Sequence, residues 1–256
     1  MDVFLRRQAN GNYIAPENTN DLEQSIPLHA KTPLELTAEV ADFRKRRIRL
    51  VNVRRQQVMR LGEQSLLHVL SDNGLQVGTV GYAGGFTGSL GRSYEESVQD
   101  TYRALEMAAA LNARSLVIVP GSQQKHIHSH ASKTIMAGLD RCLDDALRFR
   151  IDLQIAMSNI IRDRDDVFVP IGKSPLQWIE DMDSHRIKGM MVLRGASPWK
   201  DMPDSWRRCL LSGGILRLSR SCCQLVGARR VMDHIIQGLS DVPVIENPSD
   251  AFSLPH

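Results

Sequence analysis

Three histidines, His126, His128 and His130, stand at every second position of the segment "HIHSH" in a chain that has eight histidines in all. On an extended loop their side chains would point to one side, and on a helix His126 and His130 would share a face. Imidazoles at this spacing can chelate a metal, bind an anion or a polyol through hydrogen bonds, or simply open a helix. No cysteine or acidic residue lies close by to complete a zinc site, and the free amides at a helix start attract anions. We therefore expect all three to bind substrate rather than metal.

Three further side chains are of types that act on small polar molecules. Arg55 follows an apolar segment and is expected to contact a sugar or a phosphate, with a solvated surface charge as the alternative. Tyr82 precedes "AGGF" and is a candidate substrate contact, although packing of this loop by Tyr82 and Phe86 is the competing interpretation. Glu246 is a candidate catalytic base, or a carboxylate that makes only structural hydrogen bonds.

Composition narrows the class of protein. The chain has 256 residues, 42% of them hydrophobic and 24% charged, which is ordinary for a soluble globular protein. A net charge of +3 is too small to demand a nucleic-acid partner. The apolar segments have the length of strands, far short of the roughly 20 residues that span a bilayer. The spacing of the four cysteines predicts neither disulfides nor zinc, so we expect a reduced, cytoplasmic protein without a membrane partner.

These groups must be positioned by alternating strands and helices. Apolar segments rich in β-formers predict strands at 22–28, 47–53, 75–82, 115–120, 151–157, 187–193, 214–219 and 242–246. Segments of helical period lie between them, at 33–46, 56–71, from Ser93 onward, and at 129–148, with weaker ones at 175–185, 203–211 and 224–239. The helix after Ser93 is the best marked, because Ser93 and Glu96 have the spacing of a capping box.

Strict alternation of strands and helices predicts parallel strands joined by right-handed crossovers. Eight such units over about 250 residues are typical of a (β/α)₈ TIM barrel. An open doubly wound sheet is disfavoured because no glycine-rich phosphate loop is present. We therefore predict an α/β barrel with a truncated last helix, in one domain over residues 21–256, preceded by a polar extension at 1–20.

From Arg47 to Asn159 the sequence resembles the sugar phosphate isomerase/epimerase family, the xylose-isomerase-like barrels. The resemblance rests on "VGYAGGFTGSLGRSYEESVQDTYRALEMAAALNARSLVIVPGS", "HIHSHASKTIMAGLD" and "FRIDLQIAM". It implies a divalent metal held by Glu, Asp, His and Glu from strands five to eight. It also implies proton transfer next to a carbonyl, in which the cation stabilises the enediolate and a carboxylate moves the proton.

The expected metal ligands are largely absent. Apolar residues stand at three of their positions, Ala156, Leu193 and Ala196, and strand seven has Arg217 but no histidine. Only Glu246 remains as a carboxylate, and one carboxylate does not make a site for a hard dication. We therefore expect no cofactor.

The resemblance implies a protein that acts on or binds a sugar, sugar phosphate or polyol, with a degenerate metal site. The alternative is a non-catalytic pseudoenzyme barrel that binds a ligand or a partner. A DNA-repair barrel is the remotest reading, because it would need a zinc cluster. Whether the chain is an enzyme, and whether it forms a homo-oligomer, stays open at this point.

Overall fold

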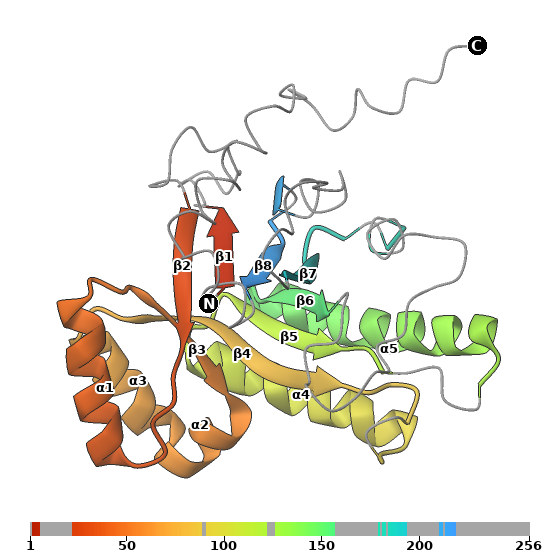
Figure 1. Cartoon of the computed structure of the whole chain (residues 1–256). Coiled ribbons are helices and arrows are strands. Elements are labelled where there is room, and N and C mark those ends of the chain that lie inside the picture. Colours follow the sequence, from red (N-terminus) through yellow and green to blue (C-terminus); the bar gives the residue numbers. More distant parts are fainter. Residues whose placement is uncertain are drawn as a thin grey trace, which may run out of the picture.

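The computed structural model describes residues 2–5, 22–88, 91–121, 126–156, 179, 181–182, 184–193, 210–211 and 213–218. In these residues eight strands form a closed barrel in the order β1 to β8, and helices lie outside it (Figure 1). The strands are β1 (Asp2–Leu5), β2 (Leu22–Pro27), β3 (Leu50–Arg54), β4 (Gln76–Gly84), β5 (Ser115–Val119), β6 (Asp152–Ala156), β7 (Ile187–Leu193) and β8 (Ile215–Leu218). The helices are α1 (Pro33–Lys45), α2 (Arg55–Leu61), α3 (Glu63–Asp72), α4 (Tyr94–Ala110) and α5 (His128–Phe149).

The predicted barrel class is confirmed, and one strand of it differs from expectation. Strands β2 to β8 run parallel to one another, at or near the first seven predicted positions. Strand β1, which lies within the predicted polar extension, pairs antiparallel with both β2 and β8. Its backbone pairs with the N–H and C=O groups of β2 and β8 that would otherwise be left unpaired at the two edges of the sheet. The predicted strand at 242–246 lies outside the described residues.

The helices also agree closely with prediction, with one correction. Helix α4 starts at the expected capping box, in which Ser93 and Glu96 satisfy each other's backbone amides. The single helix predicted at 56–71 is two helices, α2 and α3, separated by Gly62. Gly62 has a φ of +81°, a conformation that breaks a right-handed helix and that glycine adopts without steric cost. The weaker helices predicted at 175–185 and 203–211 fall largely outside the described residues, and the one at 224–239 falls wholly outside them.

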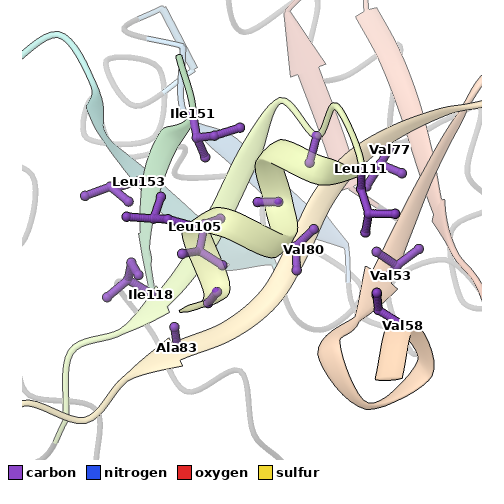
Figure 2. Packing of buried hydrophobic residues seen from close by; sticks show 14 of the residues in the cluster. Val53, Val58, Val77, Val80, Ala83, Leu105, Leu111, Ile118, Ile151 and Leu153 are labelled. Atoms are coloured by element: carbon purple, nitrogen blue, oxygen red, sulfur yellow. The ribbon is translucent and has the colours of Figure 1, made fainter. Parts of the chain in front are cut away.

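The main hydrophobic core lies between the outer faces of the strands and the helices (Figure 2). Val80 of β4, Ile118 of β5 and Leu105 of α4 meet there. A second, smaller cluster fills the barrel interior and consists of Leu50, Val117, Met190 and Ile215 with Tyr82 packed against them. Because both faces of the sheet are covered, β5 and β6 are buried at every position. None of the described helices is both long enough and apolar enough to span a membrane.

An ion pair lies at the N-terminal side of the barrel. Arg186, which precedes β7, binds Asp152 at the start of β6 through Nη1 at 2.9 Å. Their side chains are only 12% and 10% exposed. The pair is far along the strands from the C-terminal ends, where barrel enzymes place their chemistry.

Candidate functional site

Tyr82 and Arg217 meet at the C-terminal side of the barrel. Tyr82 lies near the end of β4, and Arg217 is the last residue but one of β8. The Nη1 of Arg217 donates a hydrogen bond of 3.1 Å to the phenol oxygen of Tyr82, and its Cζ is 6.0 Å from the centre of the tyrosine ring. In the closed strand order β8 is four strands from β4 in either direction, so this bond joins opposite walls.

The floor below this pair is apolar. Tyr82 packs against Val117, Met190 and Ile215, all of which are fully buried. Ala156, the last residue of β6, stands next to Met190 in the sheet register and is 1% exposed. A hydrogen bond over such a floor is stronger than the same bond in water, because the local dielectric is low.

The described residues do not fit a divalent metal at the positions where the resemblance implies one. Strand β6 ends in the methyl group of Ala156, and β7 ends in Leu193. In the part of the chain that the structure describes, no group of three or more His, Cys, Asp or Glu side chains could hold a metal ion. Ala196 and Glu246 lie outside the described residues. A hard dication needs several oxygen or imidazole ligands, and the last described residues of β6 and β7, Ala156 and Leu193, supply none.

Arg55, the first residue of α2, is tied to the wall of this site. Its Nη1 and Nη2 donate to the two carboxylate oxygens of Asp100 in α4, at 2.7 and 2.8 Å. Its Nη1 also donates to the backbone carbonyl of Tyr82 at 3.2 Å. The Arg55 side chain is 17% exposed, so the alternative of a solvated surface charge is wrong. A sugar or phosphate contact by Arg55 would have to replace these bonds, and that role stays a prediction.

Asp100 is the residue of this region that sequence reasoning missed. Burial alone would raise the pKa of Asp100, but hydrogen bonds and charge from Arg55, and then from Arg92, outweigh it and hold this pKa below its ordinary value. Arg92 reaches the same carboxylate at 2.6 Å. An Asp within an amphipathic helix carries no local signal, because its partners come from other elements.

The loop after β4 is built on close approach to β5 and α5. The amides of Gly85 and Phe86 donate to the carbonyls of Val119 and Pro120, at 2.8 and 3.0 Å. The Phe86 side chain is buried against Gly138 of α5, where a Cβ would lie 2.5 Å from the ring. The "AGGF" motif therefore packs this loop. For Phe86, the interpretation as a packing residue holds.

The histidines lie beside this same loop. The Nε2 of His126 is 3.2 Å from the carbonyl oxygen of Thr87, so this nitrogen carries the proton and donates. The rings of His126 and His130 are 5.1 Å apart, and His130 is exposed. The two rings are therefore neighbours although His126 precedes α5, so this contact is not the predicted helical i, i+4 pair. His128 is the first residue of α5, and its side chain lies outside the described part.

Comparisons with known proteins bear on the fold. No protein-family model matches the chain, and a search of the curated proteins finds no relative. Among solved structures, a 3-keto-D-glucoside 4-epimerase from E. coli superposes with a TM-score of 0.64 at 10% identity, covering 90% of this chain and 96% of its own. A D-psicose 3-epimerase from Clostridium cellulolyticum H10 gives 0.59 at 8%, with coverages of 85% and 97%. A family 2 AP endonuclease from Brucella melitensis gives 0.50 at 12%, with coverages of 67% and 69%.

At these identities the likeness concerns the fold alone. It runs along most of the chain for both epimerases, with 90% and 85% of this chain covered. The chain therefore has an α/β barrel fold like that of these two sugar epimerases.

Proposed function

We propose that the protein binds a sugar, sugar phosphate or polyol at the C-terminal side of its barrel, as an isomerase/epimerase-like protein with a degenerate metal site. The observation that carries this proposal is the hydrogen bond between Arg217 and Tyr82 over an apolar floor. Barrels of this type place their ligands at the C-terminal ends of the strands, where both residues lie.

The chemistry of the pair suits a hydroxylated or anionic ligand. A guanidinium offers several fixed donors that match phosphate, carboxylate or a developing enediolate oxygen. A phenol hydroxyl can donate and accept, as sugar hydroxyls do. The AP endonuclease neighbour means that the fold alone does not choose the ligand class. The small polar pair on an apolar floor favours a small polar molecule over a nucleic-acid backbone.

Catalysis, if the protein performs it, would proceed without the divalent metal of the family. The guanidinium of Arg217 would stabilise negative charge on the carbonyl oxygen as the neighbouring carbon loses its proton. Glu246 is our candidate for the base that removes and returns that proton. His126, just before α5, and His128 and His130, in the first turn of α5, would hydrogen-bond the ligand.

The pseudoenzyme alternative is favoured by one observation of its own. The end of β6 presents the buried methyl group of Ala156, where the resemblance implies a glutamate ligand. A barrel that has lost its metal and has no substitute base would still bind a carbohydrate without turning it over. Both the enzyme and the pseudoenzyme hypothesis predict that a carbohydrate binds, but only the enzyme hypothesis predicts proton transfer.

The first experiment is thermal melting of the purified protein with a panel of D-fructose, D-psicose, D-tagatose, their phosphates, and inorganic phosphate. A stabilising compound should lose its effect in an Arg217→Gln variant and keep it in an Asp152→Asn variant, whose change lies at the other end of the barrel. If no member of the panel raises the melting temperature of the unaltered protein, the carbohydrate proposal is wrong.

The second experiment separates enzyme from pseudoenzyme. The protein is incubated with a stabilising ketose in D₂O, and exchange at the carbon next to the carbonyl is followed by NMR. An isomerase or epimerase incorporates deuterium there, and Glu246→Gln abolishes the exchange while binding persists. Binding without exchange establishes the pseudoenzyme alternative.

A further inference from the structure

We infer that Asp100, on the outer helix α4, is a positioning residue that sets the place of Tyr82 at the C-terminal side of the barrel, acting through Arg55. This inference rests on the proposed function, in which Tyr82 contacts the ligand. It replaces the expected substrate contact of Arg55 with a structural link. The link consists of three elements, α4, α2 and β4, that meet at one guanidinium.

The guanidinium of Arg55 is shared between the two residues it would connect. Both of its terminal nitrogens bind the Asp100 carboxylate, and Nη1 also binds the carbonyl oxygen of Tyr82. A bidentate pair fixes the plane of the guanidinium as well as its distance. The direction of the second N–H bond of Nη1 is therefore fixed as well, and this bond points at the backbone carbonyl of Tyr82.

Burial makes this link stiff. The side chains of Arg55 and Asp100 are 17% and 14% exposed, so water competes little for their hydrogen bonds. The Nε of Arg55 is buried and has no hydrogen-bond partner among the described residues. The guanidinium therefore depends on Asp100 and Tyr82 to hold it, and a change at Asp100 is felt at the Tyr82 carbonyl.

Charge explains why the carboxylate cannot simply be replaced by an amide. Arg92 binds the same Asp100 oxygen as Arg55 does, so one negative charge holds two positive ones together. With asparagine at position 100, the two guanidinium groups would repel each other without compensation. Arg55 would swing away, and the carbonyl of Tyr82 would lose its donor.

The test uses the full chain labelled with 3-fluorotyrosine and fluorine NMR. The chain has four tyrosines, and the resonance of Tyr82 is assigned as the one that disappears in Tyr82→Phe. We expect Asp100→Asn to shift or broaden this resonance, and Asp100→Glu to restore it in part because the negative charge is kept. The matched control is Asp152→Asn, which breaks a somewhat more buried Asp–Arg pair at the other end of the barrel and should leave the resonance in place.

If Asp100→Asn does not fold, Arg55→Lys provides the same test. A lysine keeps the charge beside Asp100, but as a single-point donor it cannot reproduce the bidentate pair and the bond to the Tyr82 carbonyl together. A Tyr82 resonance that stays unchanged in a folded Asp100→Asn or Arg55→Lys variant overturns the inference. An equal shift in Asp152→Asn overturns it as well, because it would reflect general loosening.

Binding of D-psicose, measured by calorimetry, gives the functional arm. We expect its affinity to fall about tenfold in Asp100→Asn, the scale of one lost hydrogen bond to a ligand, and to recover in part in Asp100→Glu. A moved Tyr82 resonance with unchanged D-psicose affinity overturns the role in binding. If the unaltered protein does not bind D-psicose or another member of the panel, the proposed function fails, while the fluorine result still decides the structural link.

Discussion

The Nη1 of Arg217 and the phenol oxygen of Tyr82 are 3.1 Å apart and come from opposite walls of the barrel. The tyrosine spans the interior at the level where Met190, Ile215 and Val117 make an apolar floor. Below this level the barrel is packed with side chains, as in other closed eight-stranded barrels. The pair therefore places a guanidinium and a phenol hydroxyl beside this apolar cluster.

Removing the phenol hydroxyl should weaken both the fold and the binding of a ligand. In Tyr82→Phe the guanidinium of Arg217 loses an acceptor in partly buried surroundings, which we expect to cost about 1 to 2 kcal/mol of unfolding free energy. Urea denaturation measures that loss. Calorimetry with the stabilising sugar should show weaker binding, and an unchanged affinity would exclude Tyr82 from the ligand site.

Gly138 lies in the middle of α5, and its replacement by alanine should lower the stability of the fold, whereas the same change at a typical helix position raises it. Alanine usually stabilises a helix by about 1 kcal/mol relative to glycine. In Gly138→Ala the new Cβ would lie 2.5 Å from the ring of Phe86. Overpacking of this kind costs about 1 to 3 kcal/mol, so we expect a lower urea midpoint. The same change in a Phe86→Leu background should cost less, and equal costs in both backgrounds would show that the ring is not the cause.

Acid should remove the stabilising contribution of Asp100. Its pKa in the folded state is below the value of 3.8 for a free aspartate, chiefly because the bonds to Arg55 overcome the effect of burial. The contribution is therefore fully present well above pH 3.8, and it is lost as the pH falls below 3.8 toward the folded-state pKa. Urea unfolding across this range should show a shallower acid loss for Asp100→Asn than for the unaltered protein. Identical slopes would contradict the pairing.

The two side chains of the 126–130 histidine run that the structure describes should separate structural from ligand effects. His126 donates to the Thr87 carbonyl, so His126→Ala should reduce stability by about 1 kcal/mol. His130 is exposed, and His130→Ala should change stability by less than about 0.5 kcal/mol. If the histidines bind the ligand, both changes should also weaken binding by about 1 to 3 kcal/mol. Unchanged binding in His130→Ala would end its assignment to the ligand site.

Metal analysis tests the degenerate site. We predict that the protein, once dialysed against buffer without chelator, holds no stoichiometric Mn²⁺ or Mg²⁺, because β6 and β7 end in Ala156 and Leu193. Elemental analysis by mass spectrometry gives the ratio directly. One equivalent of metal that survives dialysis and disappears in Glu246→Gln would show that ligands outside β6 and β7 complete a site.

The sequence by itself determined the barrel. The continuous apolar run "SLVIVP" and the helical period after Ser93 are local properties of the sequence. Strict alternation of strands and helices then leaves few topologies other than a sheet of parallel strands. The loop motif was equally readable, because glycine at a crowded turn is a local requirement. Sequence pattern was insufficient at Gly62, where one residue of positive φ divides a continuous helical period, and at β1, which is too short to carry a signal of its own.

Only the tertiary structure decided which polar groups meet. Arg55 was expected to contact a ligand because it follows a predicted strand. Its partner Asp100 is 45 residues away, and Tyr82 and Arg217 are separated by 135. Such pairs depend on how the strands and helices are arranged around the barrel. The local sequence pattern does not show which residues this arrangement brings together. Buried charges pair wherever the fold brings them together, because leaving one unpaired in the interior costs far more than any local preference.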